Sequence, residues 1–152
     1  MDASIQRIEI FVEGSLVYAT REQPAPFGEA PIRDAAAAFP YFASIAAMNQ
    51  EVFAVMSLDG ASRPIKTRWI TVGLLDSNQV HPREVFADPL MDRSASVIVA
   101  HNHPSGTLEP SAEDLAITRR LQRAAELLGI KFLDHLIITR DGFVSLNQMG
   151  HV

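Results

Sequence analysis

The chain has 152 residues, a formal net charge of −5 and no cysteine. This length fits a single domain with one well-buried core. Disulfides and thiolate metal sites are excluded, so any metal must be held by imidazole and carboxylate groups. The acidic balance argues against nucleic-acid binding, which usually requires a basic surface. No apolar run is long enough to cross a bilayer, and the first nine residues do not resemble a signal peptide, so we expect a cytoplasmic protein without membrane contacts.

The first 44 residues are predicted to form a β-hairpin and a broken helix that pack on a main domain comprising residues 45–152. Two apolar segments around a glycine turn indicate the hairpin, and a proline-rich stretch predicts a loop after it. The alanine-rich segment Pro31–Ala47 predicts a helix with Pro31 in its first turn and a break at Pro40. The predicted strands are Ile5–Val12 and Leu16–Ala19, with the turn at Glu13–Ser15 and the loop at Gln23–Gly28.

The remaining chain alternates between strand and helix patterns. The continuous apolar run Ala95–Ala100 is typical of a buried central strand. An apolar stripe with helical spacing predicts a helix over Ser111–Leu128, and Gly129 is suited to cap its C-terminus. Further strands are expected at residues 51–58, 65–72, 132–138 and 143–146, a short helix at 82–90, and a loop at 76–82. This order predicts an α/β (α+β) fold with a mixed central sheet flanked by helices.

Three residues near the buried strand are candidate metal ligands. His101 and His103 are separated by one residue, and alternate residues of an extended backbone project to the same face. Asp114 falls in the first turn of the following helix, after a short loop that contains proline and glycine. Two imidazole nitrogens and one carboxylate oxygen would leave a fourth tetrahedral position open, which is typical of a catalytic zinc site.

Each part of this pattern also has a structural interpretation. A His-x-His pair by itself is often incidental, and Ser111 with Asp114 matches a capping box at the start of a helix. The combination of a buried strand, two histidines, a rigid loop and a carboxylate at a helix start favours a metal site over capping alone.

The string HNHPSG…PSAED resembles the JAMM motif of the JAB/MPN metallo-domain family, and in particular its RadC-like branch. The segments VGLLDSNQVHPREVF, TRRLQRAAELLGIKFLDHLII and the closing Val144–Leu146 are also similar to RadC-type sequences, so the resemblance covers residues 45–150. It implies a mixed sheet of the cytidine deaminase-like type. It also implies one Zn²⁺ per chain, with His101, His103 and Asp114 as its ligands.

The resemblance supplies two catalytic candidates that spacing could not select. A family glutamate that acts on the activated water corresponds to Glu51, which sequence alone cannot distinguish from Glu84 or Glu109. The family's motif serine, associated with stabilising the oxyanion, corresponds to Ser111, where capping is the alternative role. Relatives with this site cleave peptide or isopeptide bonds, so the resemblance implies a metallopeptidase that acts on a peptide or protein substrate.

Two other functions stay open at this point: a metal-dependent nuclease or DNA-repair accessory, and a non-catalytic interaction module. Longer RadC-type proteins carry a helix-hairpin-helix region before this domain, and the first 44 residues show no such pattern, which weakens the case for DNA binding. The segment Thr107–Glu109 departs from the family's usual loop and is expected to reshape the mouth of the site. His135, inside an apolar strand, is interpreted as a core histidine with satisfied hydrogen bonds.

Overall fold

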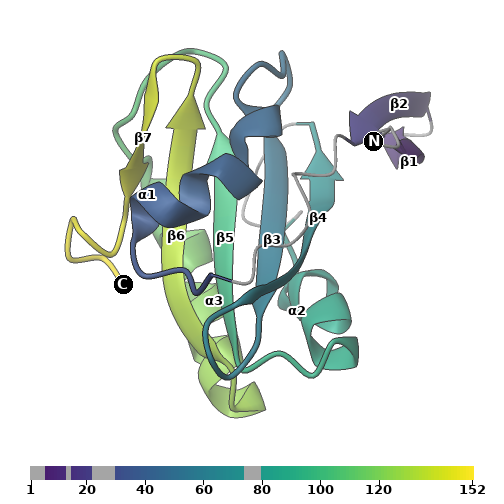
Figure 1. Cartoon of the computed structure of the whole chain (residues 1–152). Coiled ribbons are helices and arrows are strands. Elements are labelled where there is room, and N and C mark those ends of the chain that lie inside the picture. The colour runs from purple at the N-terminus through teal and green to yellow at the C-terminus, as the bar shows by residue number, and fades with distance from the viewer. Residues whose placement is uncertain (1–5, 13–14, 22–29, 74–79) are drawn as a thin grey trace.

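The computed structural model describes residues 6–12, 15–21, 30–73 and 80–152, which form a two-stranded and a five-stranded sheet (Figure 1). In the smaller sheet, β1 (Gln6–Val12) and β2 (Ser15–Arg21) pair antiparallel, as the hairpin prediction expected. Residues 13–14 of the predicted turn, the predicted loop at 23–28 and residues 76–79 lie outside the described residues.

The five-stranded sheet has the strand order β4-β3-β5-β6-β7. Only β5 and β6 run parallel within it, and the other neighbouring strands are antiparallel, which confirms the expected mixed sheet. Its strands are β3 (Val52–Leu58), β4 (Pro64–Val72), β5 (Ser96–Asn102), β6 (Lys131–Thr139) and β7 (Gly142–Ser145). The central strand β5 therefore continues two residues beyond its predicted end and includes the first histidine of the candidate site.

Two longer helices cover one face of this sheet (Figure 1). Helix α3 (Ala112–Leu128) is the crossover between the parallel strands β5 and β6, the connection that parallel pairs require. It ends at Gly129, whose φ of 71° is the left-handed conformation of a C-terminal cap. Helix α2 (Pro82–Met91) begins with Pro82, at a position where no backbone N–H is needed. No helix in the described ranges is both long and apolar enough to span a membrane.

The opposite face of the sheet is covered by a much shorter helix than the sequence predicted. Helix α1 (Ala35–Ala38) is followed by 3₁₀ turns at 39–41 and 43–45, so the expected helix beginning near Pro31 was wrong in its start and its length. Asp34 caps α1 by accepting from the Ala37 N–H at 2.8 Å, and the Ile32 N–H donates to the Ser62 carbonyl at 2.8 Å, which holds the preceding residues outside the helix. Pro40 lacks an N–H and cannot continue an α-helix, so the break was correctly placed.

Alternation along the strands divides the core into two layers. The even-numbered buried hydrophobic residues of β3, β5 and β6 form the cluster under α1, and the odd-numbered ones of β3 and β5 belong to the cluster under α2 and α3. The α1 layer includes Val52, Ala54, Met56, Ile98, Ala100, Leu136 and Ile138; the α3 layer includes Phe53, Val55, Val97, Val99, Ile117 and Leu121. Because His101 and His135 are odd-numbered, the same alternation directs their side chains to the face covered by α3.

Candidate metal centre

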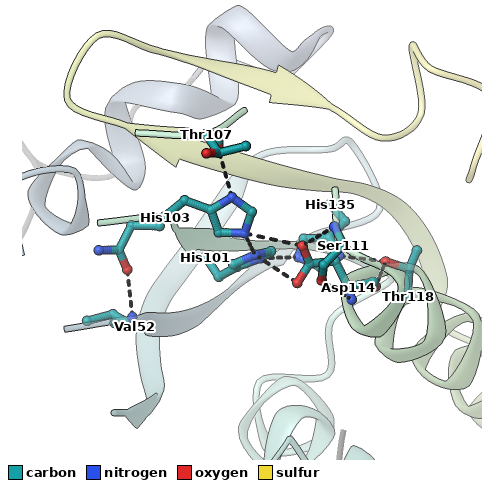
Figure 2. Close-up of polar contacts among 9 residues, drawn as sticks. Val52, His101, His103, Thr107, Ser111, Asp114, Thr118 and His135 are labelled. Carbon is teal, nitrogen blue, oxygen red and sulfur yellow. Dashed lines mark hydrogen bonds and ion pairs between the residues drawn. The ribbon is translucent and has the colours of Figure 1, made fainter. Parts of the chain in front are cut away.

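The three predicted metal ligands are brought together where β5 ends and α3 begins. His101 lies within β5, and the His103 N–H donates to the Ile138 carbonyl at 2.8 Å, so the ladder to β6 continues past the strand. The backbone therefore stays extended through both histidines and directs them to one face. Figure 2 shows their rings directed toward Asp114, in the first turn of α3.

The ligand atoms are arranged compactly. Nε2 of His101 lies 3.2 Å from Oδ1 of Asp114, and Nε2 of His103 lies 3.2 Å from Oδ2. The two Nε2 atoms are 2.9 Å apart. Around a tetrahedral zinc ion with bonds of about 2.0–2.2 Å, neighbouring ligand atoms would be separated by about 3.3–3.6 Å. The distance between the two nitrogens, and that from each nitrogen to its nearer Asp114 oxygen, are within a few tenths of an ångström of this value. One ligand atom from each residue lies within 4.8 Å of the other two, so the donor set can hold a metal ion.

The charges at this point call for a cation. Burial disfavours ionisation of Asp114, but the polar contacts with His101 and His103 outweigh it and hold the pKa of Asp114 well below its usual range. In turn, the hydrogen bond to Asp114 raises the pKa of His103 despite its partial burial. A nearly buried, ionised carboxylate faces two imidazoles, and a proton or a metal ion between them satisfies the same need for positive charge.

The second nitrogen of His103 is held by the backbone. Its Nδ1 lies 2.6 Å from the carbonyl oxygen of Thr107, which can only accept, so Nδ1 carries the hydrogen. In the neutral ring, Nε2 then presents a lone pair to the centre. Because Thr107 contributes through its main chain, this contact does not depend on its side chain.

His135 is a member of the site that sequence reasoning missed. It is fully buried, as a core histidine was expected to be, and burial lowers its pKa well below the ordinary value. Its Nε2 lies 2.7 Å from Nδ1 of His101, on the side of that ring away from Asp114. The only signal in the sequence was a histidine in an apolar strand, and its partner is fixed by the parallel pairing of β5 with β6.

Ser111 takes the capping role that was its alternative interpretation. Its Oγ accepts from the Asp114 N–H at 3.1 Å, and its own N–H donates to Oδ2 of Asp114 at 2.8 Å. These reciprocal bonds form the capping box of α3 and fix the carboxylate at the helix start. Capping uses a lone pair of Oγ, so it is compatible with a second role for the hydroxyl hydrogen.

Glu51 lies beside the histidines. Phe53 pairs with His101 across the antiparallel strands, and continuing this register by two residues places Glu51 opposite His103. Its charge contributes to the raised pKa of His103. The half-buried Glu51 also lines a pocket of about 360 Å³, together with Asn49, Gln50, Gly73, Pro104 and Ser105. The other two glutamates considered, Glu84 and Glu109, are both exposed, on α2 and in a loop.

Comparison with known proteins agrees with this geometry. A family model described as RadC-like JAB domain matches residues 32–151. The chain belongs to this family. UPF0758 proteins from Methanospirillum hungatei and Methanococcoides burtonii are similar to it, with 54% identity over 104 residues and 46% over 105 residues. A UPF0758 protein from a Picosynechococcus species shares 49% identity over 100 residues.

These matches extend over 66–69% of this chain but only 41–46% of the relatives, so this JAB domain corresponds to less than half of their length. The family expected from the motif is confirmed. The family match begins at residue 32, so it includes α1 as well as the main sheet.

Proposed function

We propose that this JAB domain is a zinc-dependent hydrolase that cleaves peptide or isopeptide bonds. One zinc ion would be held by His101, His103 and Asp114. The observation that carries the proposal is the convergence of these three ligand atoms, all within 4.8 Å of one another, beside a pocket that Glu51 lines. The centre is partly open toward solvent at His103, whose side chain keeps 11% of its exposure, against 1% for that of His101.

The side chains around the centre have distinct roles in this reaction. Zinc, when bound, supplies a Lewis acid that brings the ionisation of water close to neutral pH. The Glu51 carboxylate is placed to accept a proton from the attacking water and to return it to the leaving nitrogen. The Ser111 hydroxyl hydrogen, which capping leaves available, is suited to donate to the oxyanion that develops on the substrate carbonyl.

The proposal is tested by measuring zinc content and hydrolysis on the same preparations. The wild-type chain, Glu51→Gln and Glu84→Gln are loaded with zinc and incubated with a peptide library and an isopeptide-linked substrate. We expect one zinc per chain in all three. Glu51→Gln should lose hydrolysis by roughly 10²- to 10⁴-fold, the contribution of a general acid-base group. Glu84→Gln, an exposed glutamate on α2, is the matched control and should keep the wild-type rate.

Other outcomes would overturn the proposal. Wild-type protein that takes up no zinc would remove the metal site, and equal rates for Glu51→Gln and wild type would remove Glu51 from the chemistry. A nucleic-acid substrate included in the same screen separates the remaining functions. Cleavage of nucleic acid alone would favour a nuclease, and zinc binding without cleavage of any substrate would favour an interaction module.

A further inference from the structure

A chain of three short hydrogen bonds connects the far side of the His101 ring to the backbone of Asp114. It begins one turn into α3, where the Thr118 hydroxyl donates to the Asp114 carbonyl oxygen at 2.7 Å. A carbonyl oxygen can only accept, so the single hydrogen of this hydroxyl is committed to that bond. Whatever else contacts the Thr118 oxygen must therefore donate to it.

His135 is the group that contacts it. Its Nδ1 lies 2.7 Å from the Thr118 hydroxyl oxygen, so Nδ1 must carry the hydrogen. His135 is fully buried between a hydroxyl and a second imidazole, an environment that disfavours a charged ring, and a neutral imidazole carries one hydrogen. The other ring nitrogen, Nε2, is consequently an acceptor.

The same reasoning determines which nitrogen of His101 carries the hydrogen. Its Nδ1 lies 2.7 Å from the accepting Nε2 of His135, so Nδ1 of His101 carries the hydrogen. In the neutral His101 ring, Nε2 is then a bare lone pair, and this atom faces Asp114 and His103. Each of these hydrogen bonds therefore determines the tautomer of the next histidine. The donor-to-acceptor direction is fixed by the Asp114 carbonyl oxygen, which can only accept.

Packing keeps the rings in this orientation. Phe53, the cross-strand partner of His101, lies nearly parallel to the His101 ring, with centroids 6.2 Å apart and an interplanar angle of 12°. It also meets His135 edge-on, at 5.5 Å and 71°. His135 and Thr118 are each 0% exposed, so water does not compete for their hydrogen-bonding groups.

We propose that Thr118 and His135 are positioning residues that hold His101 in the tautomer required of a metal ligand. They do not touch the metal or the substrate. They act by placing the hydrogen of His101 on Nδ1, so that Nε2 is free to bind. Outer partners of this kind typically change metal affinity by about 10- to 100-fold. The inference rests on the proposed metal-dependent function, but its first test needs no metal.

That first test is the tautomeric state of the wild-type histidines in metal-free protein. Long-range ¹H–¹⁵N correlation spectra at alkaline pH distinguish a hydrogen on Nδ1 from one on Nε2. We expect the Nδ1–H form for both His135 and His101. A hydrogen on Nε2 of His135 would overturn the inference, and this readout requires no variant to fold.

The second test is a set of threonine variants. Thr118→Val keeps the shape of the side chain but removes the hydroxyl, so Nδ1–H of His135 loses its acceptor. The hydrogen should then move to Nε2 of His135, which in turn drives the His101 hydrogen onto its metal-binding Nε2. We expect zinc affinity, measured by competition with a chromophoric chelator, to fall by about 10- to 100-fold. Thr118→Ser restores the hydroxyl and should recover most of the affinity.

Thr139→Val is the matched control, because Thr139 is 2% exposed and its hydroxyl bonds to the Gly142 carbonyl in the β6–β7 turn. It should leave both zinc affinity and the two tautomers unchanged. Folded Thr118→Val with wild-type affinity and wild-type tautomers would refute the positioning role. If wild-type protein shows the expected tautomers but binds no zinc, the proposed function fails while the hydrogen-bond chain stands.

Discussion

Asn102 and Val52 are joined across the sheet by a hydrogen bond from the Val52 N–H to Oδ1 of Asn102, 2.6 Å long. The amide nitrogen of Asn102 donates in the other direction, to the carbonyls of Met48 and Gln50 at 3.2 and 3.0 Å. The residue between the two candidate histidines therefore holds the segment that precedes and follows Glu51. One side chain fixes the spacing between the metal ligands and the candidate acid-base group.

Replacing Asn102 is expected to separate metal binding from catalysis. Asn102→Ala leaves the buried Val52 N–H without its acceptor, a loss of about 1–3 kcal/mol in the free energy of unfolding. It also releases the Glu51 segment, so hydrolysis should fall while zinc binding persists. Urea unfolding and zinc titration check both effects. Asn147→Ala, which removes an exposed bond to the Leu133 carbonyl, is the control and should cost less. Unchanged stability of Asn102→Ala would show that the contact contributes nothing.

Zinc should stabilise the folded chain by binding it in preference to the unfolded one. At a free zinc concentration 100 times the dissociation constant, the gain is about 2.7 kcal/mol. For a domain of this size, that corresponds to a rise in Tm of roughly 5–11 °C. His103→Ala should lose the rise, and His151→Ala, an exposed histidine near the C-terminus, should keep it. Differential scanning fluorimetry with and without a chelator measures the shift, and an equal rise in His103→Ala would count against the ligand assignment.

Arg68 on β4 and Asp92 after α2 form a two-bond ion pair, at 2.5 and 2.9 Å. The Arg68 hydrogen bond lowers the pKa of Asp92, against the opposing effect of burial. Because the folded pKa is the lower one, the stabilisation is present at neutral pH and is lost as the pH falls through that folded value. We expect Asp92→Asn to cost about 1–3 kcal/mol at pH 7, with the difference from wild type shrinking in acid.

Urea unfolding at pH 7 and at several acidic pH values gives this profile. Asp88 also contacts Arg68, at 3.4 Å, but its side chain is 52% exposed. Asp88→Asn should therefore cost less than about 1 kcal/mol. If the loss of unfolding free energy in Asp92→Asn stays the same at every pH, the stabilisation does not come from ionised Asp92.

Gly129 is required by backbone geometry alone. Its φ is 71°, and a Cβ built at this position would meet nothing within 4 Å. Gly129→Ala should therefore destabilise the chain by about 1–2 kcal/mol through the left-handed conformation. Gly60 has equally open surroundings but no left-handed φ, so Gly60→Ala should leave stability unchanged or slightly raised. The test compares the denaturation midpoints of Gly129→Ala and Gly60→Ala. Equal midpoints would rule out a conformational role for Gly129.

The strands and helices of the main sheet could be predicted because their signals are local. Each of these signals lies within one continuous stretch of sequence: the apolar run that became β5, the stripe and terminal glycine of α3, and the Asp59-Gly60 turn between β3 and β4. The helix predicted over residues 31–47 was wrong because a contact between residues distant in sequence determines where it starts. Alanine content favours a helix, but the Ile32–Ser62 hydrogen bond that keeps its start extended involves residues distant in sequence.

In the candidate site, too, some residues could be identified from local spacing and others only from the folded arrangement. The three ligand candidates lie within 14 residues of one another, so spacing could suggest them. Glu51 immediately precedes β3, and its place beside the histidines depends on an antiparallel register that no local pattern specifies; only resemblance to a family identified it. His135 and Thr118 lie on β6 and α3, and their contact with His101 requires both the parallel crossover and the alternation of side chains along β6.

The capping box at the start of α3 has one more consequence. Oδ2 of Asp114 accepts the Ser111 N–H at 2.8 Å and also faces Nε2 of His103 at 3.2 Å. A positive charge that arrives between the imidazoles draws electron density from this oxygen and weakens the bond from Ser111. The amide resonance of Ser111 is thus a built-in reporter of occupancy, readable in ¹⁵N-enriched protein without substrate or any change to the sequence.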